Sequence, residues 1–253
     1  MNVDLRRLAV TALLVLAVGA PIVAQREAWT RPFPAHRVIG NLYAVGTYDL
    51  AVFLLTSDEG HILINTGLDD STVLIRENIQ SLGFRLEDVK ILLQMQAHWD
   101  HTAALAEIKQ ITGAEMWATA ADAPVLEDGG FSDPHFGGRE SFTPVEVDKI
   151  IADGEVIELG EIRLTVLETP GHTAGSISLL VADAKVLIVG DALQFRRRRL
   201  ELPAPAVSQD MQQARESLKR LLPLDFETIC FSHFEPLRND GRQAVQALID
   251  DVT

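Results

Sequence analysis

The residues best suited to chemistry are four polar side chains within one short stretch: Gln96, His98, Asp100 and His101. They follow an apolar run at 89–93 that is typical of a buried strand, and a helical pattern of small residues begins directly after them. Imidazole nitrogens and carboxylate oxygens are ligands that zinc prefers. The stretch therefore predicts a metal site at the end of a strand. The alternative is a polar turn in which Asp100 lies near a helix N-cap.

Three further residues of ligand type follow apolar, strand-like segments: His172, Asp191 and His233. Before His172, the pair Pro170-Gly171 favours a tight bend, which leaves the imidazole at a strand end. A single histidine in such a place is more often structural than a ligand. Four separate strands that each end in such a residue, in a chain with 7 histidines, predict a metal site. The remaining histidines are expected to be structural or at the surface: His36, His61 and His135.

The order of these motifs resembles that of the metallo-β-lactamase superfamily. The motifs are Gln-x-His-x-Asp-His at 96–101, Pro-Gly-His-Thr-x-Gly-Ser at 170–176, Gly-Asp-Ala-Leu at 190–193 and Ser-His-Phe-Glu-Pro at 232–236. The first half is most similar to the third subclass of class B β-lactamases, at 41–47, 59–64 and 118–126, whereas the last third resembles superfamily hydrolases in general. The resemblance implies an α/β fold, a four-layer αββα sandwich, formed by residues 25–253 as a single domain.

The resemblance also implies roles by motif position. His98 and His172 bind a first zinc ion, and Gln96 occupies the place of its third ligand. The expected ligands of a second ion are Asp100, His101 and His233. Asp191 bridges both metals in thioesterase-like members but not in lactamases of the third subclass, so both possibilities stay open. The implied reaction is hydrolysis by metal-activated hydroxide, with Asp100 as the catalytic residue that orients it.

Three positions depart from the family pattern. Gln96 stands where most members have histidine, and a neutral amide binds zinc more weakly, so the first site is expected to be the weaker one. Alternatively, Gln96 points away and the first site is empty. Asn65 replaces an aspartate that supports the metal loops from behind, and such supporting carboxylates raise metal affinity. The protein is therefore expected to work with one or two zinc ions. Ala192 replaces a serine with which the lactamases hold their substrate.

An arginine run at 196–199 follows the Gly-Asp motif closely. Arg196 or Arg197 is a candidate for binding a substrate carboxylate, because the planar guanidinium suits that group, and Gln194 is a further candidate beside them. The alternative is a solvated loop whose positive charge balances an acidic protein.

The ends of the chain and its charge limit location and partners. A basic pair at Arg6 and Arg7, an apolar run at 8–18 and a small residue at Ala24 predict a signal peptide at 1–24 and a periplasmic or secreted protein. An uncleaved membrane anchor is the alternative; once the leader is cleaved, no stable membrane insertion is expected. The net charge of −14 argues against nucleic acid as a partner and leaves small-molecule substrates. The oligomeric state is left open.

The elements that must position the site alternate between short strands and helices. Strands are expected near 41–47, 51–57, 61–66, 90–95, 115–118, 145–150, 155–158, 162–168, 176–182, 185–189 and 227–231, and helices near 71–82, 101–112, 120–126, 208–222 and 241–250. A glycine-rich loop at 129–142 is expected to lie over the site.

Together these patterns predict an exported zinc hydrolase, in the first place a β-lactamase that opens the β-lactam ring. Two alternatives remain: a hydrolase of the same fold that acts on a thioester, lactone or ester, and a zinc-binding protein with little catalysis.

Overall fold

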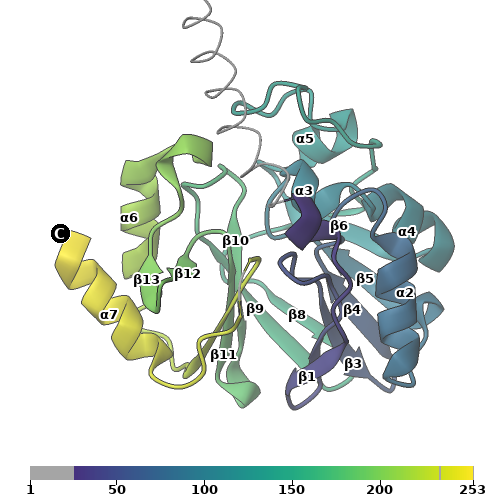
Figure 1. Ribbon diagram of the computed structural model, residues 1–253, viewed down its shortest axis with the longest axis horizontal. Coiled ribbons are helices and arrows are strands. Elements are labelled where there is room, and N and C mark those ends of the chain that lie inside the picture. The colour runs from purple at the N-terminus through teal and green to yellow at the C-terminus, as the bar shows by residue number, and fades with distance from the viewer. Residues whose placement is uncertain (1–25, 234, 253) are drawn as a thin grey trace, which may run out of the picture.

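Two β-sheets packed face to face form the centre of the computed structural model, which describes residues 26–233 and 235–252 (Figure 1). One sheet has seven strands in chain order: β1 (His36–Ile39), β2 (Leu42–Ala44), β3 (Phe53–Ser57), β4 (Gly60–Ile64), β5 (Val89–Leu93), β6 (Glu115–Thr119) and β7 (Lys149–Ile151). The other has five strands in the order β14 (Thr228–Phe231), β11 (Val186–Gly190), β10 (Ile177–Val181), β9 (Ile162–Glu168) and β8 (Val156–Leu159).

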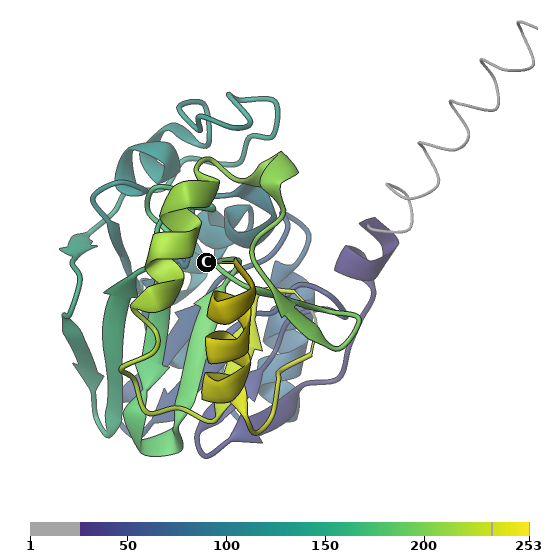
Figure 2. The ribbon, with the colours of Figure 1, turned by 90° about the vertical axis from the view of Figure 1, so that its left-hand side faces the viewer.

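Helices cover the outer face of each sheet. On the seven-stranded sheet, α2 (Thr72–Ser81) and α4 (Leu105–Thr112) bury apolar residues against β3, β4 and β5. On the five-stranded sheet, α6 (Met211–Lys219) and α7 (Gly241–Val252) lie side by side and do the same against β11 and β14 (Figure 2). A third apolar cluster fills the space between the sheets. The predicted four-layer αββα sandwich is therefore confirmed.

The direction of the strands explains why polar residues collect at one edge. β4, β5, β6 and β7 are parallel, and so are β11 and β14. Parallel strands end at the same edge of a sheet, where loops bring side chains from distant parts of the sequence together. The segments after β5, β11 and β14 carry six of the seven predicted ligands; His172 follows β9.

Some elements differ from those expected. The helix predicted at 101–112 is divided into α3 (Trp99–Thr102) and α4, so that Asp100 and His101 lie in a short helix of their own. The helix predicted from 208 begins at Met211, because the Asp210 carboxylate caps it by accepting hydrogen bonds from two backbone amides. Strand β1 and the hairpin of β12 (Gln194–Arg196) and β13 (Arg199–Glu201) are not among the expected elements.

The remaining short elements are a helical stretch at 26–30, α5 (Ala123–Asp128) and three 3-10 turns, at Leu86–Asp88, Ala182–Ala184 and Pro205–Val207. Within the part of the chain that the structure describes, we find no helix with the length and apolar character needed to cross a membrane. The predicted signal peptide at 1–24 lies outside the described residues.

Candidate metal centre

The carboxylate of Asp191 lies at the centre of the polar cluster. Its Oδ2 accepts hydrogen bonds from Gln96 Nε2 at 2.8 Å and His101 Nε2 at 2.9 Å. The Nε2 atoms of His172 and His233 lie 3.7 and 3.6 Å from the same oxygen. Four of the other predicted ligands therefore surround one buried carboxylate, although they come from three separate loops.

The three residues predicted for the second metal form a compact group. One ligand atom each from Asp100, His101 and His233 can be chosen so that all three lie within 4.8 Å of one another. Asp100 Oδ2 is 3.5 Å from Nε2 of both histidines. Two imidazoles and a carboxylate at this spacing fit a zinc ion in both ligand type and number.

The residues predicted for the first metal are also inside the protein. Gln96 is fully buried, and its amide nitrogen donates to Asp191, so its side chain lies in the cluster and does not point away from it. Among the described residues, Gln96 Oε1 and His172 Nε2 have no hydrogen-bond partner, and the His98 and His172 rings lie 4.7 Å apart. A buried polar atom without a partner costs about 1–3 kcal/mol. A cation held by these atoms would satisfy them, so this donor set fits a metal as well.

The charges of the cluster suit a cation. Burial lowers the pKa of His172 to about 4 and also lowers the pKa of His98, so both imidazoles are neutral at pH 7, the form that binds metal. Burial alone would raise the pKa of Asp100, but His101 and His233 bring it down to about 2. Neighbouring histidines likewise hold the pKa of Asp191 well below its ordinary value against the effect of burial. Burial would lower the pKa of His233, but the carboxylates of Asp191 and Asp100 raise it well above its ordinary value. The site thus combines two carboxylates with two neutral imidazoles, those of His98 and His172.

Hydrogen bonds on the outer side of two histidines fix their orientation. His233 Nδ1 donates to the backbone oxygen of Asp49 at 3.1 Å. The Ser208 hydroxyl donates to the Ala204 oxygen at 2.8 Å and therefore accepts from His172 Nδ1 at 3.1 Å. In both rings Nδ1 donates outwards and Nε2 is directed into the cluster. For the neutral His172 this leaves the Nε2 lone pair for a ligand, whereas His233 Nε2 faces the carboxylates of Asp100 and Asp191.

Asn65 lies behind the cluster, where the sequence pattern places it. It is buried, and its φ of 61° lies in the left-handed region that asparagine tolerates better than most residues. Its Oδ1 accepts from the Met95 amide at 3.2 Å, and its Nδ2 donates to Ser232 Oγ at 3.3 Å. Asn65 thus connects the loop that carries Gln96 to the residue before His233 without adding a charge.

Two buried aspartates next to the cluster were not predicted. Asp122 accepts backbone hydrogen bonds from Ala97 and Gly175, so it links the two loops that carry Gln96, His98 and His172. Asp133, in the glycine-rich loop, places Oδ2 3.6 Å from His98 Nε2. The sequence contained one indication of Asp133, because the glycine-rich loop that carries it was expected to lie over the site. It contained none of Asp122, which reads only as a polar residue at the start of a helix.

Asp122 gives a pH-dependent prediction. Burial, with the charge of Asp133 adding to it, raises the pKa of Asp122 from 3.8 to about 7. A raised pKa means that the folded state keeps the proton that the unfolded chain loses, so this group lowers stability progressively as pH rises from about 4 to 7. Replacing Asp122 by asparagine removes this pH-dependent cost. We expect the stability of D122N relative to wild type to improve by about 2 kcal/mol between pH 5 and pH 8. Urea unfolding at both pH values measures it, and an unchanged difference would contradict the assignment.

The predicted substrate-binding residues lie on the β12–β13 hairpin. Gln194 is buried in β12, whereas Arg196 and Arg197 are exposed at the turn, where Arg197 and Arg198 both have positive φ. Arg199 extends from the hairpin to Asp251 of α7, with 3.6 Å between the charged atoms. The hairpin lies beside α7 on the outer side of the five-stranded sheet (Figure 2). The structure brings the seven predicted metal ligands together but leaves Arg196 and Arg197 at an exposed turn.

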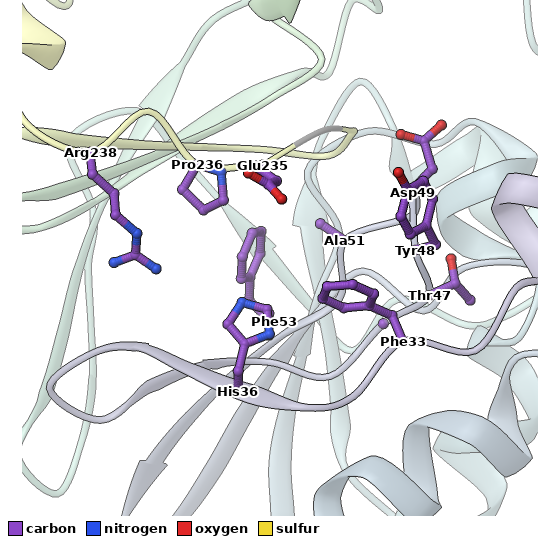
Figure 3. A pocket seen from close by; sticks show the side chains of 12 residues that line it. Phe33, His36, Thr47, Tyr48, Asp49, Ala51, Phe53, Glu235, Pro236 and Arg238 are labelled. Atoms are coloured by element: carbon purple, nitrogen blue, oxygen red, sulfur yellow. The ribbon is translucent and has the colours of Figure 1, made fainter.

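A cavity of about 510 Å³ lies next to the metal cluster and shares Asp49 with it. Its walls include Phe33, Phe53 and Tyr48. His36, expected to be structural, also lines it, and Asp49 and Arg238 lie at opposite ends (Figure 3). The volume is that of a small-molecule pocket.

An aromatic group forms one side of the cluster. The Trp29 ring packs 5.6 Å from the Trp99 ring and 5.7 Å from the His233 ring, and Trp29 Nε1 donates to Asp49 Oδ2 at 3.2 Å. Trp29 and Asp49 are functional candidates that sequence reasoning missed, since neither belongs to a motif. The other two histidines lie outside the cluster: His61 is buried against Phe84, and His135 packs on Phe136.

The chain belongs to the metallo-beta-lactamase superfamily, whose family model matches residues 48–233, and it is a hydrolase of that superfamily. Class B3 enzymes, which the sequence motifs predicted, are among the solved structures to which it is similar. A beta-lactamase from Chitinophaga pinensis is 34% identical, with a TM-score of 0.75 over 89% of this chain and 93% of that one.

A class B3 di-zinc metallo-beta-lactamase, LRA-12, from an Alaskan soil metagenome is 36% identical, with a TM-score of 0.74 over 88% of this chain and 93% of that one. A curated relative, the hydroxyacylglutathione hydrolase of Rhodospirillum rubrum, is 31% identical over 114 residues, which cover 45% of this chain and 36% of that protein.

Proposed function

We propose that this chain is an exported zinc β-lactamase that opens the β-lactam ring. One observation carries the proposal: the six other predicted ligands gather around Asp191 in a chain that is similar to a di-zinc class B3 enzyme over 88% of its length. Export is supported by the leader pattern at 1–24 and localises the protein to the periplasm or the medium.

The two donor sets have separate tasks in this proposal. Gln96, His98 and His172 would hold one ion, and Asp100, His101 and His233 would hold the other. Asp191 lies within reach of both sets. A zinc ion held by these residues would lower the pKa of a bound water to about 7 and so supply a nucleophile at neutral pH. Asp100 accepts a hydrogen bond from the attacking water and so directs it towards the carbonyl carbon. Asp49 and Ser208 keep the Nε2 atoms of His233 and His172 directed into the cluster.

A second candidate function is hydrolysis of a thioester. The central place of Asp191 within 4 Å of three histidines favours it, because a bridging aspartate is the thioesterase-like arrangement. Ala192 also lacks the serine hydroxyl through which lactamases hold their substrate. The hydroxyacylglutathione hydrolase relative supports the same candidate.

The test compares substrates in one assay. The chain from Gln25 onwards is incubated with a carbapenem, a cephalosporin and a glutathione thioester, each with added zinc and with a chelator. We expect chelator-sensitive opening of the lactam ring that exceeds thioester hydrolysis. Thioester turnover without lactam turnover would replace the first candidate by the second. A folded, zinc-loaded protein that turns over none of these substrates would contradict both.

A further inference from the structure

The glycine-rich loop after α5 is held in one conformation by its own hydrogen bonds. The Asp128 carboxylate accepts from the Gly130 and Ser132 amides at 3.0 and 2.9 Å, and Phe142 closes the loop by donating to the Gly129 oxygen at 3.0 Å. Asp133 Oδ1 accepts from the His135 and Phe136 amides at 2.7 and 3.1 Å. One oxygen of Asp133 is thus fully used in shaping the loop.

The other oxygen of Asp133 faces the metal cluster. Asp133 is only 5% exposed, and its Oδ2 lies 3.6 Å from His98 Nε2, a buried nitrogen that has no hydrogen-bond partner among the described residues. The Phe136 ring meets the His98 ring edge to face at a centroid distance of 5.0 Å and covers this pair. Carboxylate and imidazole are therefore enclosed together, one oxygen facing one nitrogen.

We propose that Asp133 is a positioning residue that holds the proton of His98 on Nε2 and thereby leaves Nδ1 as the metal-binding atom. This inference rests on the proposed metal centre. The two ring nitrogens point in different directions, so an Nε2 that faces Asp133 directs Nδ1 elsewhere. A carboxylate can only accept a hydrogen bond, and its charge makes the imidazole a better ligand. His233 and His172 are oriented through the other nitrogen, Nδ1. The Asp49 backbone oxygen accepts from His233, and the Ser208 hydroxyl accepts from His172.

This role has a particular value in a chain with Gln96. The first donor set has one imidazole fewer than most family members, and its amide oxygen is a weaker ligand. The Asp133 carboxylate behind His98 makes one of the two remaining imidazoles a stronger metal ligand. The loop is therefore a part of the first site as well as a cover over it.

Asp133→Asn isolates the proposed effect. In this variant the amide oxygen takes the place of Oδ1, because the His135 and Phe136 amides both require an acceptor there. The Asn NH₂ group then faces His98 Nε2 and donates to it, so the ring proton moves to Nδ1, the wrong atom for metal binding. We expect zinc affinity at the first site to fall about 10–100-fold, as for other outer partners of metal ligands, with the second site unchanged.

The experiment has two readouts, taken on the folded chain from Gln25. Long-range ¹H–¹⁵N NMR of the metal-free protein reports which His98 nitrogen carries the proton, and competition with a chromophoric chelator measures zinc affinity at each site. Asp128→Asn is the matched control, because it changes an aspartate that shapes the same loop without facing His98. We expect an Nε2–H tautomer in wild type and Asp128→Asn, and an Nδ1–H tautomer in Asp133→Asn.

An Nδ1–H tautomer in wild type would overturn the proposal, and so would equal loss of zinc affinity in the Asp128 and Asp133 variants, which indicates a role in loop structure alone. The NMR readout needs no metal. Its outcome is therefore separate from a failure of the proposed function, which would appear as a wild-type protein that binds no zinc at either site.

Discussion

Replacing His101 by alanine is expected to abolish most hydrolysis and to release zinc from the second site. His101 donates to Asp191 at 2.9 Å and belongs to the compact group with Asp100 and His233. The substitution removes one of the three ligands of the second site. It also removes the imidazole that contacts the buried carboxylates of Asp100 and Asp191. Loss of an outer partner of a ligand already costs about 10–100-fold, so loss of the ligand itself is expected to exceed 100-fold in kcat/KM.

Steady-state kinetics and metal analysis after dialysis check this expectation. His135→Ala is the control, because this histidine lies near the cluster, with its ring 6.4 Å from that of His98, but belongs to neither donor set. The control is expected to keep its zinc and most of its activity. An H101A protein with wild-type zinc content and wild-type turnover would show that the cluster is not the active centre.

Replacing Gly171 by alanine is expected to cause a large loss of stability. Gly171 has a φ of +140°, and a Cβ there would lie 2.4 Å from Ala214 N and 2.5 Å from Ala214 Cα. These are backbone atoms of α6, so the clash can be relieved only if the loop before His172 moves away from the helix. A clash added to backbone strain is expected to cost about 3 kcal/mol or more, which lowers Tm by roughly 10 °C in a domain of this size.

Gly113→Ala is the matched control for backbone strain alone. Gly113 also has a positive φ, of +65°, but a Cβ there would meet nothing within 4 Å. Its expected cost is about 1–2 kcal/mol. Thermal unfolding of both variants separates the two effects, and equal losses would show that the contact between the Gly171 loop and α6 is not important for stability.

Much of the fold follows from local sequence signals. The apolar run at 89–93 forms β5, a buried parallel strand in which continuous hydrophobicity is the rule. The helical pattern closed by Gly113 ends as expected, with Gly113 in the left-handed conformation. The seven ligand residues were predicted because metal chemistry requires particular side chains, and these occur at strand ends. Periodicity did not predict the layer order, which came from the motif resemblance.

Features that depend on contacts across the fold were not predictable in this way. The break between α3 and α4 reflects a backbone bond from Ala103 to Gly67, which is far away in the sequence. The Asp122 carboxylate accepts hydrogen bonds from backbone amides of two other loops, and the Asp49 backbone oxygen accepts one from His233. These partners are distant in the sequence and meet only in the folded protein. The hairpin turn at Arg197 and Arg198 needs two positive φ angles, for which arginine gives no signal.

Two donor sets around Asp191 are expected to bind zinc. Diffraction from crystals grown with zinc, measured on both sides of the zinc absorption edge, tests it most directly. We expect an anomalous peak among Asp100, His101 and His233, and a second peak of equal or lower occupancy among Gln96, His98 and His172. Zinc bound elsewhere on the protein, with no peak in this cluster, would contradict it.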